Sequence, residues 1–441
     1  MSKEDFNEYM NQAKTLLGQG KGEEALKYFS KAEQEDNMNE EVYLGKGIAL
    51  ANLERYEEAK TELSKVLKLK KDNGLAIFHL ANIEVLLGNK AKGIELFNNA
   101  IATGYDNAQV FYSLGLMQED DGDDDLAIRN YTKAIIKDPN RPDIRIRKIR
   151  VQIKNNYLQE ALQSLDELIL SNPDVFEGYH LKFLVLESLS KYDEAEAVID
   201  EALSLFKKDV NFALDKASVL IDTKRYDEAL SYLSNIKETM EVSDTNKALR
   251  QIAMQEARIY AFKEDMAGLI SSIEKAIDFS KKNDYLDTEA WFMLMNCYIT
   301  QEKFEQVLEI ARKLKASGEE DTYTLAAYYY EPFALKGLNK MDEAMPLFKE
   351  AVSYYRSKSL DNPGFLDFYS YRVMCLREMG EYDKALELAD YLVNVGEKVA
   401  EMHILKATVL EVAGRKEEAE AERKLAVSVA QPGSAVAKLI K

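Results

Sequence analysis

The amino-acid sequence repeats with a period of 34 residues. Stretches such as GKGEEALKYFSKA, ERYEEAKTELSKV and RYDEALSYLSNI each place a small residue at the same point. A fixed period of this length is typical of stacked repeats, in which each unit buries its apolar surface against its neighbours. We therefore expect one continuous array of about twelve units instead of separate globular domains. The equivalent positions are Ala25, Ala59, Gly93, Ala127, Ala161, Ala195 and Ala229, spaced by 34 residues, and then Leu269, Val307, Ala344, Ala385 and Ala419, spaced by 34 to 41 residues.

Each unit has the pattern of two packed helices. A second small residue recurs twelve positions before the first one, for example at Gly47, Ala81 and Gly115. Apolar residues flank these positions at the i, i+3, i+4 and i+7 spacing of a helix with one buried stripe. Breaks such as Gly88-Asn89 separate the two stripes of a unit. Because only 7 prolines and 20 glycines occur in 441 residues, we predict an all-α fold of helix-turn-helix units.

The unit around Gly115 carries a fuller motif. It has an aromatic residue, Leu-Gly, an alanine, a second aromatic residue and a proline at fixed offsets. By this pattern the sequence resembles the tetratricopeptide repeat family from about Phe6 to Ala430. The resemblance implies a right-handed α-solenoid superhelix whose first helices line a concave groove for protein partners. The matching residues are Phe111, Leu114, Gly115, Ala127, Tyr131 and Pro139, and Trp291, Leu294 and Tyr298 repeat the first half of the pattern.

Two units depart from this pattern. In the fifth unit, Ile149 replaces the small residue and Arg145 replaces the aromatic residue. In the tenth unit, Pro332 falls inside the first helix, where it lacks a backbone N–H and crowds the preceding turn. We therefore expect irregular helix geometry near Pro332.

The lengths of the connections divide the array into two parts. Residues 1–242 hold seven regular repeats, and residues 243–433 hold units with longer connections. The insertion KETMEVSDTNK separates the two parts, so we place a boundary near Ser243. Because the open end of a repeat array needs a cover, we expect residues 434–441 to form a short C-terminal cap.

The net charge of −19 at pH 7 argues against nucleic acid and anionic membranes as partners, because their phosphates are repelled over most of the surface. The first residues, MSKEDFNEYM, contain acids where a secretory signal needs an apolar run, and no later stretch reaches the length of a membrane-spanning helix. We therefore expect a cytoplasmic protein. Cys297 and Cys375 are too few for a disulfide framework or a four-cysteine zinc site.

No pattern in the sequence predicts an enzyme, a metal site or a cofactor. His79, His180 and His403 lie in different units without a cluster of cysteines or carboxylates beside them, so we interpret them as groove or packing residues. The acidic turn at Gly122 fails as a calcium loop, because Ile128 takes the twelfth position, where a bidentate Glu is required. We interpret its aspartates as caps of the next helix.

A basic stretch in the fifth unit, which includes Arg147 and Arg150, is the leading candidate for a binding site. Guanidinium groups bind carboxylates and tyrosine rings offer rigid contact surfaces, so together they suit an acidic or C-terminal peptide. The alternative is that these arginines pair with acidic turns of neighbouring units. By resemblance to the family, the residues three before and one after the central small position face the groove. The expected groove residues are Phe78, Asn82, Tyr112, Ile146, Arg147, Arg150 and His180.

A second candidate surface lies in the C-terminal part. Aromatic residues and Met are enriched where protein partners bind. The alternative is that the same residues form a buried stripe, because aromatic residues at helical spacing often belong to a core. The residues of this second surface are Asn296, Tyr329, Phe333, Met374 and Arg377.

These features favour a non-enzymatic adaptor that binds a peptide or helix of a partner protein in its concave groove. One alternative is a structural scaffold that assembles with itself into a homo-oligomer. Another is a peptide-sensing regulator without a DNA-binding domain, because helical-repeat receptors also close around short peptides. The identity of the partner does not follow from the fold.

Overall fold

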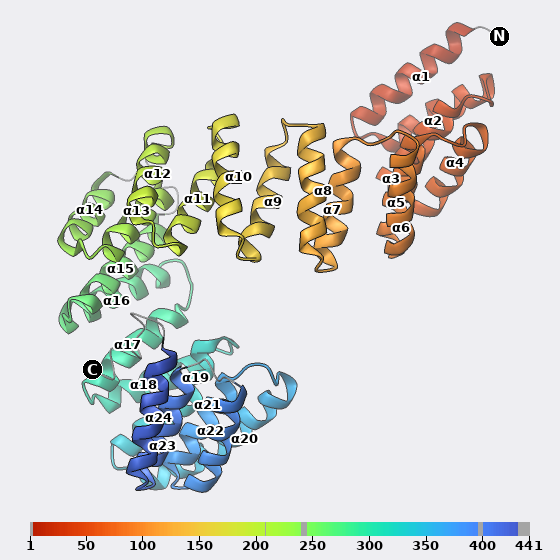
Figure 1. Ribbon diagram of the computed structural model, residues 1–441. Coiled ribbons are helices and arrows are strands. Elements are labelled where there is room, and N and C mark those ends of the chain that lie inside the picture. Colours follow the sequence, from red (N-terminus) through yellow and green to blue (C-terminus); the bar gives the residue numbers. More distant parts are fainter. Residues whose placement is uncertain (1–2, 208, 240–244, 396–399, 431–441) are drawn as a thin grey trace. The chain divides into compact units, whose positions relative to one another are not determined.

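The computed structural model describes residues 3–207, 209–239, 245–395 and 400–430 (Figure 1). The described residues form 24 α-helices and contain no β-strand. The chain is therefore an all-α solenoid, and its helices follow one another as the twelve expected pairs. By its internal contacts the chain divides into two compact parts, which we call the N-terminal unit and the C-terminal unit. The division falls between Asp215 and Lys216.

The N-terminal unit contains α1 to α12 and the start of α13. Its helices are α1 (Lys3–Gly18), α2 (Gly22–Glu35), α3 (Glu40–Asn52), α4 (Tyr56–Leu69), α5 (Gly74–Leu86), α6 (Lys90–Ala102), α7 (Ala108–Asp120), α8 (Asp124–Lys137), α9 (Pro142–Lys154), α10 (Leu158–Ser171), α11 (Phe176–Ser188), α12 (Tyr192–Leu205) and α13 (Val210–Asp222).

The C-terminal unit contains the end of α13 and the remaining helices. These are α14 (Tyr226–Thr239), α15 (Thr245–Phe262), α16 (Met266–Lys281), α17 (Thr288–Thr300), α18 (Phe304–Ala316), α19 (Thr322–Gly337), α20 (Met341–Asp361), α21 (Asp367–Glu378), α22 (Tyr382–Val395), α23 (Ala400–Val412) and α24 (Lys416–Val429).

The small residues of the period lie where two helices meet. Ala25, Ala127 and Ala229 are completely buried, as the periodicity predicts. A Cβ atom on Gly115 of α7 would lie only 2.5 Å from the ring of Tyr131 on α8, which is closer than two carbon atoms approach. The two helices of this unit can therefore pack at their observed separation only because residue 115 has no side chain.

Polar caps and tight turns delimit the helices. The side chain of Asp123 accepts a hydrogen bond from the backbone N–H of Leu126, which confirms that the acidic turn caps α8. Asn73 caps α5 in the same way by accepting from Ala76. The turn before α8 contains Gly122 with a φ of 77°, a left-handed conformation that glycine adopts without steric cost.

The irregular unit contains a proline inside a helix, as predicted. Pro332 is buried in the middle of α19, where it cannot donate a hydrogen bond to the preceding turn.

The predicted boundary near Ser243 and the predicted cap at 434–441 lie outside the described residues. Within the described part of the chain, none of the helices has the length and apolar character required to cross a membrane.

Candidate functional site

Three charge pairs join successive first helices of the N-terminal unit, and we call them the charge ladder. Each pair connects two neighbouring repeats, because its members lie about one repeat apart in the sequence. The ladder runs from α7 through α9 and α11 to α13. The pairs are Arg147 with Glu119 (2.8 Å), Arg150 with Glu177 (2.6 Å) and His180 with Asp215 (3.0 Å).

Arg147 pairs with a carboxylate that a second side chain also binds. Its Nε donates to Oε2 of Glu119, and the hydroxyl group of Tyr131 donates to the same oxygen over 2.6 Å. The hydrogen bond with Glu119 raises the pKa of Arg147 above its usual value. Burial, together with the hydrogen bond to Glu119, raises the pKa of the Tyr131 phenol. Glu119 therefore fixes both Arg147 and the tyrosine that packs under Gly115.

Arg150 is the most accessible residue of the charge ladder. Its side chain is 58% exposed, and that of Glu177 is 33% exposed. Water competes with both groups, so an exposed ion pair of this kind contributes about 0–1 kcal/mol. The guanidinium therefore remains available to another carboxylate.

His180 forms the last pair of the charge ladder. Its Nδ1 lies 3.0 Å from Oδ2 of Asp215. The hydrogen bond to this carboxylate raises the pKa of His180 above its usual value, although partial burial acts in the opposite direction. The imidazole accordingly carries more positive charge near neutral pH than a free histidine.

The other predicted groove residues differ in how far they reach the surface. Phe78 is buried, and its ring packs against the rings of Phe97 and Tyr105, both at a centroid distance of 5.7 Å. Asn82 is partly exposed and donates to the carbonyl oxygen of Phe78. Tyr112 and Ile146 are also partly exposed.

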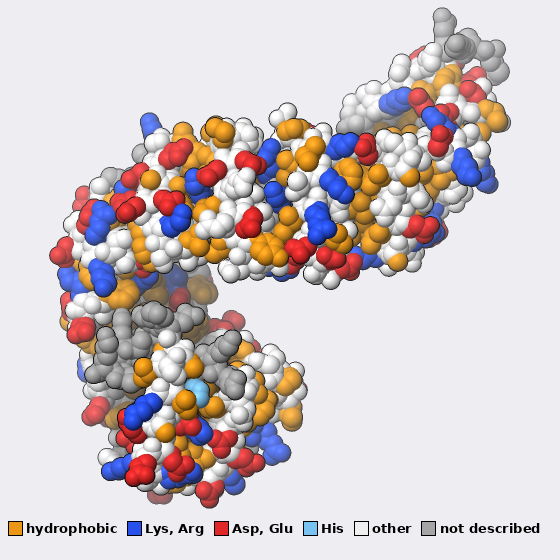
Figure 2. All heavy atoms as spheres, viewed as in Figure 1, with side chains coloured by type: hydrophobic (Ala, Val, Ile, Leu, Met, Phe, Trp, Pro, Cys, Tyr) orange, Lys and Arg blue, Asp and Glu red, His pale blue; other side chains and the backbone are white. Residues whose placement is uncertain are grey.

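The basic stretch pairs with carboxylates of its own repeat as well as of the neighbouring one, whereas the alternative interpretation named only acidic turns of neighbouring repeats. Arg141 binds Asp143 over 2.7 Å, and Arg145 lies 3.8 Å from Glu167. Lys148 is half-buried, and this burial lowers its pKa. Acidic, basic and apolar side chains are accordingly interspersed over the face of the molecule seen in Figure 2.

The second predicted surface is partly a core. Tyr329 is only 2% exposed, and its ring packs at 5.6 Å from that of Phe333. Arg377 donates to the Tyr329 hydroxyl over 3.3 Å and to Glu378 over 2.5 Å. The structure therefore brings the predicted residues Tyr329, Phe333 and Arg377 together. Met374 packs beside them, whereas Asn296 lies on α17.

Comparison with known proteins places the repeat pattern in a family. Two sequence models of the tetratricopeptide repeat match, one over residues 16–73 and 119–182 and the other over residues 78–142, 180–238 and 374–435. The chain belongs to the tetratricopeptide repeat family. Repeats of this family are protein-interaction modules, so the chain is a protein-interaction scaffold.

Individual relatives of this tetratricopeptide repeat protein are distant. A TPR repeat-containing protein of Methanocaldococcus jannaschii is 24% identical over 223 residues, which are 48% of this chain and 39% of that protein. The chain thus spans well under half the length of this curated relative.

Solved structures also resemble the chain. YrrB, a TPR protein with an unusual peptide-binding site, is 19% identical and matches 44% of this chain and 97% of its own, with a TM-score of 0.35. The structure of Naa15/Naa10 bound to HypK-THB is 14% identical and covers 98% of this chain and 70% of that one, with a TM-score of 0.40. The C-terminal part of a TPR repeat-containing protein from Cytophaga hutchinsonii is 15% identical and covers 62% and 95%, with a TM-score of 0.41.

In this tetratricopeptide repeat array, sequence reasoning missed the acidic half of the charge ladder. Glu119, Glu177 and Asp215 lie 28, 27 and 35 residues from their partners. These separations are close to the repeat period, so a search for opposite charges one unit apart would have found them. Among the described residues, no group of three histidine, cysteine or acidic side chains is arranged to hold a metal ion.

Proposed function

We propose that this tetratricopeptide repeat protein is a cytoplasmic, non-enzymatic adaptor that binds an acidic peptide or helix of a partner protein along the charge ladder. The observation that supports the proposal best is a row of partly exposed side chains on successive first helices. Tyr112 on α7, Ile146 and Arg150 on α9 and His180 on α11 combine aromatic, aliphatic and cationic groups. Such a combination suits a peptide with one apolar and one acidic face.

The internal ion pairs are compatible with such a partner. The Arg150–Glu177 pair is exposed to water, so replacing Glu177 with a carboxylate of the partner costs little free energy. Arg147 is less available, because Glu119 is also bound by Tyr131. We therefore assign the main contact with the partner to Arg150.

The test is a quantitative pull-down of partner proteins with the intact chain. Arg150→Glu should weaken binding of a recovered partner at least tenfold, because it places a carboxylate where the partner's carboxylate binds. Glu177→Gln should strengthen binding, because it leaves Arg150 without its internal acid. Arg129→Glu, an equal change of charge at an exposed position on α8, is the matched control. If all three variants bind the partner as the wild type does, the groove assignment is wrong.

A second candidate function is self-assembly. Leu425 on α24, the last described helix, is 48% exposed, so its apolar side chain is accessible to a second copy of the chain. Sedimentation velocity distinguishes this function from the first one. A particle that stays monomeric at high concentration excludes self-assembly, whereas a dimer that Leu425→Asp converts to a monomer supports it.

A further inference from the structure

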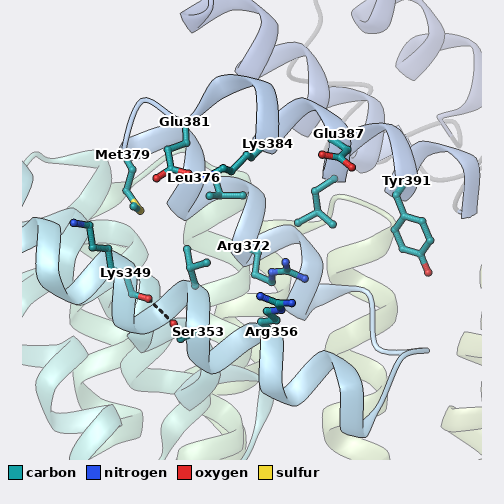
Figure 3. A pocket seen from close by; sticks show the side chains of 12 residues that line it. Lys349, Ser353, Arg356, Arg372, Leu376, Met379, Glu381, Lys384, Glu387 and Tyr391 are labelled. Carbon is teal, nitrogen blue, oxygen red and sulfur yellow. Dashed lines mark hydrogen bonds and ion pairs between the residues drawn. The ribbon is translucent and has the colours of Figure 1, made fainter.

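A cavity of about 650 Å3 lies between α20, α21 and α22 in the C-terminal unit (Figure 3). The flanking helices α20 and α22 are second helices of their units, and α21 is the first helix between them. The cavity is thus a furrow on the second-helix side and is separate from the charge ladder. Val352, Leu376 and Leu388 give it an apolar lining.

Two arginines without acidic partners lie at the centre of this furrow. Figure 3 shows the guanidinium groups of Arg356, from α20, and Arg372, from α21, close to each other. The Nε of Arg372 is buried and has no hydrogen-bond partner. Among the residues that the structure describes, no carboxylate forms an ion pair with either arginine. Burial and, next, the charge of Arg356 lower the pKa of Arg372. An anion bound between the two guanidinium groups would therefore relieve their mutual repulsion.

Two similar furrows among the described residues contain ion pairs, and neither has an unpaired arginine. Between α2, α3 and α4, Arg55 binds both Glu58 (2.7 Å) and Glu23 (3.2 Å). Between α16, α17 and α18, Lys281 lies 3.3 Å from Asp278. The repeat architecture thus provides the furrow, whereas the unpaired arginines are particular to the one beside α20.

The length of α20 explains why the arginine pair occurs here. This helix has 21 residues, whereas α22 has 14. Arg356 lies beyond the fourteenth residue of α20, in the additional turns. The longer helix therefore carries Arg356 past the usual end of a second helix, to the position of Arg372.

We propose that this furrow binds an acidic segment of a partner protein. Two neighbouring carboxylates of that segment bind Arg356 and Arg372, and an adjacent aliphatic side chain packs on Val352 and Leu376. Lys349 also lines the furrow and adds positive charge, whereas Lys384 is bound by Glu381 over 2.6 Å. Glu387 is the other acidic residue of the lining, so the four basic residues outnumber the two acidic ones. The charge complementarity favours this occupant, because paired guanidinium groups bind carboxylates in a fixed geometry and the rest of the chain is strongly acidic.

The test uses two fluorescent pools of ten-residue peptides and the full-length chain. One pool has a fixed central Glu-Glu-Leu, the other a central Gln-Gln-Leu, and all other positions are degenerate. The wild type should bind the acidic pool at least tenfold more tightly than the neutral pool in fluorescence anisotropy. Arg372→Gln and Arg356→Gln should each remove most of this preference. Arg356 is exposed, so its variant tests the site even if Arg372→Gln fails to fold.

Arg415→Gln is the matched control, because it removes the same charge from an exposed ion pair at the start of α24. It should leave the preference for the acidic pool unchanged. Equal binding of both pools, or equal binding by the wild type and both furrow variants, overturns the proposal. If inorganic phosphate protects the wild type against thermal unfolding but the acidic pool does not bind, the furrow takes a small oxyanion and the peptide proposal is wrong. Because Arg150 of the charge ladder also attracts acidic peptides, the same titrations are repeated in an Arg150→Glu background. A preference for the acidic pool that persists there and is lost with Arg356→Gln belongs to the furrow, whereas one lost with Arg150→Glu alone belongs to the charge ladder.

Discussion

The guanidinium of Arg250 on α15 holds the carboxylate of Asp287, at the start of α17, through two hydrogen bonds. Nε donates to Oδ2 over 2.7 Å and Nη2 donates to Oδ1 over 2.9 Å. The Asp287 side chain is completely buried, and Ser280 donates a further hydrogen bond to it over 2.9 Å. Burial raises the pKa of Asp287. These hydrogen bonds and one from the backbone of Ala290 together lower it by more, so the pKa lies below its usual value. The pair thus joins two adjacent units through a buried charge.

Removing the cation from this pair should destabilise the C-terminal unit. Arg250→Met leaves the buried Asp287 carboxylate without its main partner, so we expect the free energy of unfolding to fall by about 3 kcal/mol. Urea unfolding followed by circular dichroism measures this loss. Lys263→Met is the control, because its partner Asp227 is 91% exposed and the pair contributes little. An equal change of the urea midpoint in both variants would contradict the assignment.

Acid should weaken the N-terminal unit through Glu84. This carboxylate is 2% exposed and accepts hydrogen bonds from Lys92 (2.9 Å) and Asn89 (2.8 Å), and it lies 3.1 Å from Lys60. The hydrogen bond from Lys92 contributes most to lowering the pKa of Glu84, which falls to about 2 despite its burial. A depressed pKa adds stability above the unfolded-state value of about 4.3, and this stability is lost as the pH falls towards 2.

Glu84→Gln should therefore be less stable than the wild type at pH 7, and the difference in the free energy of unfolding should narrow between about pH 4 and pH 2. Urea titrations at a series of pH values measure this difference. The exposed Glu24 offers a matched control, since Glu24→Gln removes a carboxylate that has no comparable set of donors. A difference for Glu84→Gln that does not vary with pH would show that the ionised carboxylate is not the stabilising group.

The His180–Asp215 pair, unlike Glu84, should stabilise the folded state most at low pH. The pKa of His180 is raised in the folded state, so the pair stabilises the unit fully below the unfolded-state value of about 6.5. This contribution is lost as the pH rises through the folded-state pKa. Asp215→Asn should lower the pKa of His180, because it removes the negative partner.

Nuclear magnetic resonance of the imidazole protons measures the titration of His180 directly, because the chain has only 3 histidines. His79 is the internal reference, since burial lowers its pKa to about 4 and it lies in another unit. The pKa of His79 should not change in Asp215→Asn. An unchanged pKa of His180 in this variant would rule out the proposed ion pair.

A single methyl group at Gly115 should disturb the contact between α7 and α8. The added Cβ would lie 2.5 Å from the Tyr131 ring, which is buried and fixed by Glu119. Forcing atoms into such a packed contact costs about 1–3 kcal/mol, which outweighs the helix propensity gained by alanine. We therefore expect Gly115→Ala to lower the melting temperature. Gly18→Ala should be neutral or stabilising, because a Cβ there meets open space.

The sequence by itself determined the repeat, the helices and the buried contact inside each pair. The small residues at Ala25, Ala127 and Ala229 are buried as predicted, and Asp123 caps α8 as predicted. These features depend on the local spacing of small, apolar and capping residues. A helix buries the residues of one stripe wherever it packs, so the period alone identifies them.

The tertiary structure decided which side chains meet across units. The distance and rotation between neighbouring helix pairs determine whether Arg150 contacts Glu177. They also determine whether Tyr329 lies in the groove or in the core. The arginine pair in the furrow also depends on α20 continuing to Arg356 and packing beside α21. Local sequence does not encode these relations, because packing between units fixes helix positions to within a side-chain length and thereby selects each charged partner.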